Sequence, residues 1–441
     1  MLRFIISILV LLFGSFAAWH LLSAQRIAPP LDLPPQFRGN FLAIADADMI
    51  ATAYANGILN KEAGVEDTLH YVSGEDVSIP LSSLHVSNSV ISWPAILEWH
   101  PNYNYAYVAE TRGIHQGESQ QMTDVFSEFP KGQKISVVDY SNPQQPQIIQ
   151  EVMVGTNLQN VSINASGDLL VAGSTEQEQE MVIMKLVEGK IEHTYTFSDP
   201  EIDYEDGTDG GFRTLEFHPE QDIIAANLNG KSVAFYQLKR TGSDIQIERM
   251  GESLTVGKKL SVGNWHPNGN FFLISDVAWG EGTLGAVLNG KGRLISIRFD
   301  TSGEHEVASS VKVGLSPEGF DLSPNGRYAI AVNMHRTYGP KQFWFVPGRT
   351  KASLSLISID PNSGQLVKLG KAYGFRGALP EDAIFDQDSN SIAVAVYQEQ
   401  DENFPDYGWI DFWEIRNDQL VKTNTQLKLT RGLHNLLLLP E

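Results

Sequence analysis

The stretch Gly263–Asp276, GNWHPNGNFFLISD, contains a pattern that recurs along the chain. An aromatic and a polar residue precede a Pro-Asn-Gly turn, and a short apolar run follows it. This pattern predicts one strand, a tight reverse turn and an antiparallel partner strand. Similar units are ILEWHPNYNYAYVAE from Ile96, VSINASGDLLVAGS from Val161, TLEFHPEQDIIAANL from Thr214, FDLSPNGRYAIAVN from Phe320 and AIFDQDSNSIAVAVY from Ala383.

One position in the turn, usually a proline, marks each unit. These turn anchors are Pro101, Ala165, Pro219, Pro267, Pro324, Gln387 and Pro440. Repeats of roughly 40 to 60 residues that contain only strands are typical of β-propeller blades. The sequence therefore predicts one repeat architecture rather than several unrelated domains.

The seventh unit is divided between the two ends of the chain. The C-terminal LHNLLLLPE supplies an inner strand and the start of a turn, and Gly39-Asn40-Phe41 continues where Pro440-Glu441 stops. Pairing of the last strand with the first blade would remove the open sheet edges at this junction. We therefore predict an all-β, seven-bladed β-propeller over residues 39–441, closed by the C-terminal strand.

Composition excludes several classes of function. The net charge of −21 argues against nucleic acid as a partner, because phosphates require a basic face. The chain has no cysteine, so disulfides, thiolate metal sites and a cysteine nucleophile are excluded. No Gly-rich phosphate loop, HExxH motif or nucleophile elbow is present.

The N-terminal segment predicts export. Residues 1–24 contain Arg3, the apolar run Phe4–Leu22 and a small residue at Ala24, as in a signal peptide. The run is also long enough to be an uncleaved signal anchor. Residues 25–38 are a Pro-rich linker. We expect a periplasmic or secreted protein, in contact with a membrane only if the segment is uncleaved.

Alignment of the inner strands on the turn anchor gives columns of equivalent residues. Three residues before the anchor stand Glu98, Ser162, Glu216, Asn264, Asp321, Ile384 and Leu437. The two-residue period of a strand predicts that this column faces away from the apolar column beside it. Its acids would then converge on the central channel, with a raised pKa or a bound divalent cation. Alternatively, each carboxylate binds backbone in a neighbouring blade.

Histidines form part of another column. His100, His218 and His266 stand one residue before the anchor. They belong to turns of different blades, so we expect them to bond local backbone rather than a metal. No cofactor motif is evident in the sequence.

Polar residues also occupy the loops that lead into the inner strands. Six residues before the anchor stand Ala95, Gln159, Arg213, Ser261, Glu318, Glu381 and His434. We expect these loops to meet at one mouth of the channel, together with long connections between the second and third strands. One of those connections, residues 333–352, is cationic and aromatic. It predicts an anionic or sugar-like ligand, or else pairing with neighbouring acidic loops.

The stretch Gly314–Arg327, GLSPEGFDLSPNGR, resembles the repeat of the YVTN and lactonase-type (6-phosphogluconolactonase-like) seven-bladed propellers. The resemblance covers residues 39–441 as architecture. Lactonase-type members place Arg-His directly after the proline that leads into an inner strand. Here Arg213 keeps the arginine, but Thr214 follows it. The resemblance therefore implies the fold more strongly than it implies 6-phosphogluconolactonase activity.

Three functions agree with these features. The first is a small-molecule site at the channel mouth, with lactone hydrolysis or isomerisation as its chemistry. Arg213 would polarise a carbonyl or carboxylate, Glu216 or Glu98 would act as general base, and His434 as acid. The remaining ligand contacts would come from His335, Arg336, Lys341, Trp344, Asp321 and Glu381.

The other two functions need no catalysis by this chain. A propeller that binds a protein or glycan through its loop-rich face is the main alternative. The third function is a redox-associated propeller whose cofactor belongs to a partner chain. Fold alone does not choose among them.

Overall fold

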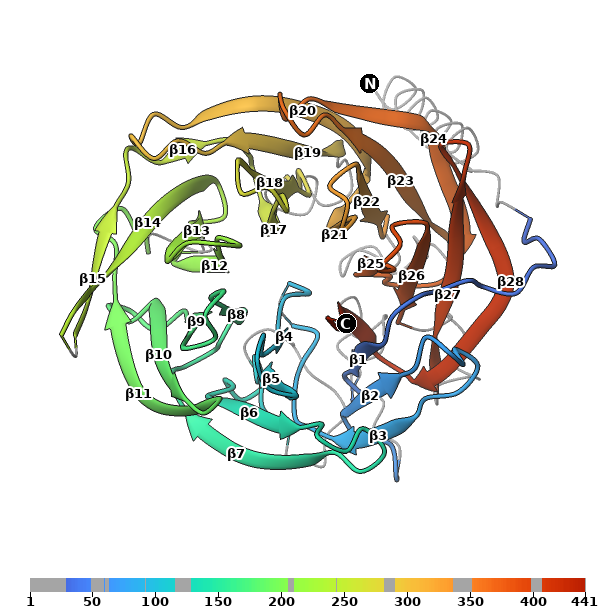
Figure 1. Ribbon diagram of the computed structural model, residues 1–441, viewed down its shortest axis with the longest axis horizontal. Helices are drawn as coiled ribbons and strands as arrows, with labels where there is room; N and C mark the ends of the chain where they lie inside the picture. Colours follow the sequence, from blue (N-terminus) through green and yellow to red (C-terminus); the bar gives the residue numbers. More distant parts are fainter. Residues whose placement is uncertain are drawn as a thin grey trace, which may run out of the picture.

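A computed structural model describes residues 29–48, 59, 63–91, 93–115, 128–204, 210–242, 244–280, 290–335, 351–397 and 407–440. Seven antiparallel sheets stand around a central axis (Figure 1). The prediction of an all-β, seven-bladed propeller is confirmed. Among the described residues, no helix is long and apolar enough to cross a bilayer. The expectation for residues 1–24 lies outside the described residues.

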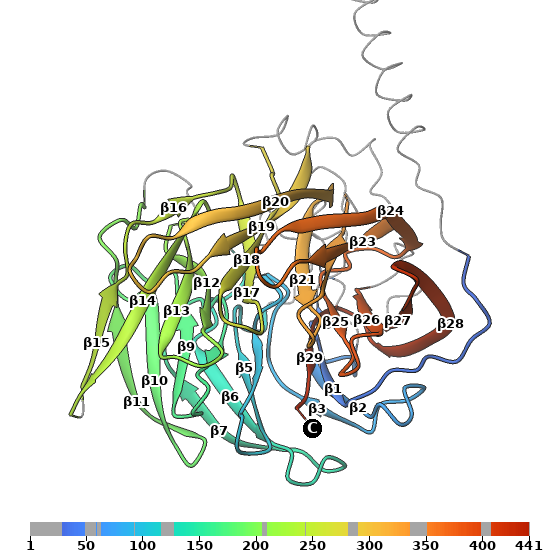
Figure 2. The same cartoon turned by 45° about the horizontal axis from the view of Figure 1, so that its top comes forward.

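Each blade runs from an inner strand at the axis to an outer strand at the rim (Figure 2). Blade 1 contains β29 (Leu433–Leu438), β1 (Phe41–Ala45), β2 (Thr68–Val72) and β3 (Ser82–His85). Blade 2 contains β4 (Leu97–Trp99), β5 (Tyr105–Ala109), β6 (Lys134–Asp139) and β7 (Gln147–Met153). Blade 3 contains β8 (Ser162–Ile163), β9 (Leu169–Gly173), β10 (Met181–Val187) and β11 (Lys190–Phe197).

The remaining four blades follow in chain order. Blade 4 contains β12 (Phe212–Phe217), β13 (Ile223–Leu228), β14 (Ser232–Thr241) and β15 (Asp244–Arg249), with β16 (Leu254–Thr255) beside β14. Blade 5 contains β17 (Leu260–Trp265), β18 (Phe271–Asp276), β19 (Lys291–Arg298) and β20 (Glu306–Leu315). Blade 6 contains β21 (Pro317–Leu322), β22 (Tyr328–Asn333), β23 (Lys351–Ile359) and β24 (Leu366–Arg376). Blade 7 contains β25 (Ala383–Phe385), β26 (Ser391–Val396), β27 (Tyr407–Arg416) and β28 (Gln419–Thr430).

The two chain ends close the ring. Strand β29 pairs antiparallel with β1, and Phe41 lies opposite Leu438. Beyond the strands, the Leu439 amide donates to the Asn40 carbonyl oxygen at 2.9 Å. The chain therefore resumes at Gly39 where Pro440 ends, as the split repeat predicts.

Residues 29–38 of the predicted linker pack against blade 7. The Leu31 amide donates to the Lys422 carbonyl oxygen on β28 at 2.8 Å. Phe37 is buried, and its ring meets Phe41 and Phe412 edge to face. Figure 1 shows this segment crossing blade 7 before it enters β1. This part of the linker is thus docked on the propeller, by backbone hydrogen bonds and by the buried Phe37 ring.

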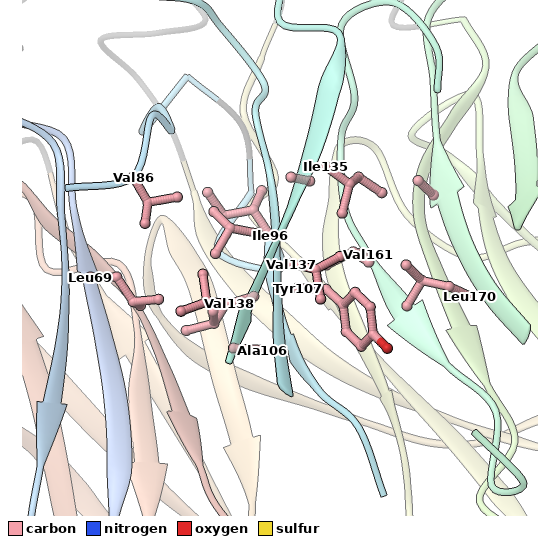
Figure 3. Close-up of a cluster of buried hydrophobic side chains, with 14 of the residues drawn as sticks. Leu69, Val86, Ile96, Ala106, Tyr107, Ile135, Val137, Val138, Val161 and Leu170 are labelled. Atoms are coloured by element: carbon pink, nitrogen blue, oxygen red, sulfur yellow. The ribbon is translucent and has the colours of Figure 1, made fainter. Parts of the chain in front are cut away.

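The core lies between neighbouring blades, because the middle strands carry apolar residues on both faces. Figure 3 shows Leu69 of blade 1, Ile96 and Val137 of blade 2, and Leu170 of blade 3 within one buried cluster. The Tyr107 hydroxyl in the same cluster donates to the Gly189 carbonyl oxygen at 2.8 Å. Outer strands such as β7 are largely exposed. Burial against two neighbours therefore stabilises the inner three strands of each blade most strongly.

Histidines at the turns of blades 4 and 5 link each of these blades to the next. His218 accepts the Glu220 amide at Nδ1 (3.1 Å), and its Nε2 lies 3.0 Å from the carbonyl oxygen of Gly269 in blade 5. His266 lies 2.8 Å from the Gly326 carbonyl oxygen of blade 6 in the same way. Burial lowers the pKa of His218, so its neutral ring donates from Nε2. The column bonds backbone, as expected.

This link between blades predicts that alanine substitution destabilises the protein by different amounts at Gly269 and Gly242. Both have positive φ, at 71° for Gly269 and 64° for Gly242. A Cβ at Gly269 would lie 2.4 Å from His218 Nε2, whereas nothing lies within 4 Å of one at Gly242. Gly242→Ala should cost about 1–2 kcal/mol for the backbone conformation alone. Gly269→Ala should cost about 2 kcal/mol more, measured by urea unfolding. An equal loss of stability in the two variants would show that His218 does not pack closely against Gly269.

Candidate functional site in the central channel

A cavity of about 270 Å³ runs along the propeller axis. The inner strands of the ring supply its walls. The polar side chains in its lining are Glu98, Glu216, Asn264, Asp321, Asp382 and Asn435. The apolar part of the lining includes Leu97, Val161, Val262, Phe320, Ile384, Leu436, Leu437 and Leu438. The column three residues before the turn anchor thus supplies most of the polar wall.

The acids reach the lumen because of the strand geometry. Successive side chains on a strand point to opposite sides. Phe217 and Phe385, each next to a lumen position, are buried between blades. Glu98, Glu216 and Asp321 are only partly buried, because solvent reaches into the lumen. The structure therefore brings these three predicted site residues together in one cavity.

Backbone groups hold two of the three carboxylates. Glu98 accepts the Trp99 amide at 2.7 Å and also the backbone amide of Ile163 in blade 3. Asp321 accepts the amide of Phe385 in blade 7 at 2.8 Å. These two acids therefore link adjacent blades, as the structural alternative predicts.

Glu216 departs from this arrangement. Its carboxylate accepts one hydrogen bond, from Ser162 Oγ at 3.0 Å. Ser162 Oγ itself accepts the Phe217 amide. No backbone amide of the described residues donates to the Glu216 side chain, although Trp265 Nε1 donates to its backbone oxygen. Glu216 is therefore the lumen acid with the most acceptor capacity left for a ligand.

Burial raises the pKa values of the lumen acids. It raises the pKa of Glu98 to about 7 and that of Asp321 to about 7. Asp382 rises to a pKa of about 7 for the same reason. Burial and then the charge of Glu98 raise the pKa of Glu216 well above its usual range. Near neutral pH the lumen therefore contains carboxyl groups in both protonation states.

Three other predicted residues lie on the strand-start face, where the inner strands begin, and outside the cavity lining. Arg213 donates from Nη1 to Gln159 Oε1 at 3.1 Å. His434 is buried with Nε2 2.9 Å from Asn88 Oδ1, and burial lowers its pKa to about 3. Glu381 is also buried, which raises its pKa. The structure separates Arg213 and His434 from Glu216.

Apolar side chains pack together on the strand-start face. They come from several blades and are Leu59, Val90, Ile91, Phe129, Met334, Ala378, Leu379 and Tyr397. His335 is buried beside them, with Nε2 2.9 Å from Ser353 Oγ. Arg336, Lys341 and Trp344 lie outside the described residues. The described part of the expected loop-rich mouth thus contains an apolar cluster beside the polar groups.

Two lining residues were not predicted as site residues. Asp382 accepts the Leu436 amide and the Asn435 side-chain amide, each at 2.8 Å. Both Asp382 and Asn435 stand two residues before the lumen-facing column. The two-residue period, extended one step toward the strand start, would have identified them.

In the part of the chain that the structure describes, no three His, Asp or Glu side chains are arranged to hold a metal ion.

No family model matches the chain, and no curated protein is similar to it in sequence. By fold it belongs among seven-bladed propellers. The periplasmic gluconolactonase of Pseudomonas aeruginosa superposes with a TM-score of 0.63 at 15% identity, covering 91% of this chain and 99% of that one. A putative 6-phosphogluconolactonase of Bacteroides fragilis gives 0.62 at 13% identity, covering 92% and 100%. A second, from Bacteroides uniformis, gives 0.60 at 14% identity, covering 92% and 100%.

At these identities the likeness concerns the fold. The architecture expected from the sequence resemblance is confirmed.

Proposed function

We propose that this protein is an exported propeller that hydrolyses a small lactone or related sugar-like ester in its central channel. The observation that carries the proposal is Glu216. It faces the lumen, keeps free acceptor capacity, and has a pKa raised toward the range of a general base. A cavity of about 270 Å³ has room for a molecule of sugar size.

The chemistry follows from the lumen carboxyls. The Glu216 carboxylate takes a proton from a water molecule, whose oxygen attacks the lactone carbonyl carbon. The ring carbon–oxygen bond then breaks, and the proton returns to the leaving ring oxygen, which gives an open-chain hydroxy acid. Neutral Glu98 can donate its O–H to the carbonyl oxygen, because a protonated carboxyl in an apolar site acts as a hydrogen-bond donor. Protonation of Glu98 also removes the charge that opposes ionisation of Glu216.

Arg213 and His434 have no part in this proposal. Arg213 does not line the cavity, and the neutral His434 ring has no proton to give as an acid near pH 7. A periplasmic location is supported by residues 1–24, and by a superposable protein that is described as a periplasmic gluconolactonase.

The proposal is tested by proton release from a panel of five- and six-membered sugar lactones, after subtraction of spontaneous hydrolysis. We expect catalysed opening that rises with pH as Glu216 ionises. A panel without catalysed opening would refute hydrolysis. It would leave the docking alternative, whose loop residues 336–350 lie outside the described residues.

A further inference from the structure

The ionisable side chains in the cavity lining are all acidic. Four of its six polar side chains are carboxyls and two are amides, and none of the described lining residues is Lys, Arg or His. The amides are already engaged: Asn264 Nδ2 donates to the Phe320 carbonyl oxygen and Asn435 Nδ2 to Asp382. The wall therefore offers a ligand hydrogen-bond acceptors where its carboxyls are ionised, and O–H donors where they are neutral.

Two more carboxyls lie just beyond the lining at the strand-start face. Glu318 and Glu381 are buried, and their Oε2 atoms accept no hydrogen bond from the described residues. Lys259 is the cation that acts on Glu318, while Asp382 and Asp46 add negative charge around Glu381. Unpaired buried acceptors favour a hydrogen-bond donor or a cation nearby.

The effect of these groups on a ligand depends on its charge. Inside the ring, charges interact more strongly than in water. A carboxylate in the lumen would force the wall acids to take up protons or would be repelled by them. An ammonium group would be held by charge-assisted hydrogen bonds, which are stronger than neutral ones. An uncharged polyol should bind with an affinity between those of the ammonium and carboxylate ligands.

We infer that the central channel selects its ligand by charge. It takes uncharged polyhydroxylated molecules, binds those with an ammonium group more tightly, and rejects carboxylates. This inference concerns the site of the proposed function. It also favours product release in that function, because the hydroxy acid left by lactone opening is a carboxylate that the wall repels.

The pH response depends on the groups that face the lumen. These are Glu98 on β4 with Tyr107 behind it, Glu216 on β12, Asp321 on β21 and Asp382 before β25. Around the strand-start face they are joined by Glu318, Glu381, Asp46 and Lys259. As pH rises, the acids ionise, so affinity for an ammonium ligand should rise and affinity for a carboxylate should fall.

Three open-chain six-carbon ligands that differ in charge test this inference by calorimetry: glucamine (cationic), sorbitol (neutral) and gluconate (anionic). At pH 8 and physiological salt, glucamine should bind at least about tenfold more tightly than sorbitol, and sorbitol at least about tenfold more tightly than gluconate. From pH 6 to pH 8 only the affinity for sorbitol should stay constant.

Matched variants separate the channel from the overall negative charge. Glu216→Gln should reduce the preference for glucamine, because one lumen charge is lost. Glu220→Gln removes an exposed charge of the same blade outside the cavity lining and should leave the preference unchanged. Equal binding of gluconate and sorbitol, or no binding of any of the three, would overturn the inference even if lactones are hydrolysed. The expected order without lactone turnover would refute the proposed hydrolysis alone.

Discussion

Glu216→Gln is expected to lower lactone turnover by about 10²- to 10⁴-fold, which is the usual contribution of a positioned general base. Glutamine has nearly the same shape and can still accept from Ser162 Oγ. It cannot take a proton from water at any pH near neutrality. The rate that remains should therefore lose the rise with pH that the wild type shows.

The fold should not weaken in this variant. The wild-type carboxylate is costly to ionise, because burial and the nearby Glu98 both oppose its charge. Removal of the titrating group should therefore raise stability above the ordinary glutamate pKa, and should raise it more near pH 8 than near pH 6. Glu220→Gln is the control for turnover as well. Wild-type rates in Glu216→Gln would remove Glu216 from the mechanism, and a fall in stability would make the loss of turnover uninformative.

The propeller was predictable because each repeat is defined by residues close together in the sequence. A turn such as Pro267-Asn268-Gly269 needs a positive φ at its glycine, 71° here, and the apolar runs around it follow the strand period. The ring closure was predictable for the same reason, since the repeat that Pro440 begins continues at Gly39. The docking of Phe37 was not, because a single aromatic residue in a Pro-rich segment gives no periodic signal.

The lumen column was also predictable, but the position of the Arg213 column was not. Strand period fixes the side of Glu98, Glu216 and Asp321 relative to the turn anchor. Between Phe212 and Leu215 the pairing of β12 with β13 shifts register. An added residue in one strand reverses the alternation beyond it, so the column of Arg213 could not be placed by counting.

The neighbouring blade determines which lumen carboxylate keeps acceptor capacity for a ligand. Asp321 is held by the Phe385 amide, which is distant in sequence, whereas no equivalent amide reaches Glu216. No pattern in a single strand distinguishes the two. The structure was therefore needed to choose Glu216 from the predicted column.

The stability of the protein should fall as pH rises from about 5.5 to about 8. Burial raises the pKa of Asp321, Asp382 and Glu98 each to about 7. The folded state therefore binds more protons than the unfolded state in this window, and the free energy of unfolding decreases with pH. Each such acid contributes up to about 1.4 kcal/mol per pH unit, so we expect a total loss of at least about 3 kcal/mol by urea unfolding.

Two buried histidines act in the opposite direction but at lower pH. Burial lowers the pKa of His434 to about 3 and that of His70 to about 4. The unfolded state then binds more protons below the ordinary histidine pKa, and stability falls as pH falls through that range. The acids outnumber these histidines, so stability should be highest on the acidic side of neutrality.

Two aspartates of blade 6 separate the lumen contribution from general charge effects. Asp321→Asn keeps an acceptor for the Phe385 amide but removes a titrating group, so the fall between pH 5.5 and pH 8 should become shallower by about 1–2 kcal/mol. Asp360 is exposed, and the amides of Asn362 and Ser363 lower its pKa. Its contribution is already complete below this window, so Asp360→Asn should lower stability equally at both pH values. If Asp321→Asn leaves the slope unchanged, burial does not oppose the ionisation of Asp321, and the raised pKa of this lumen acid is refuted.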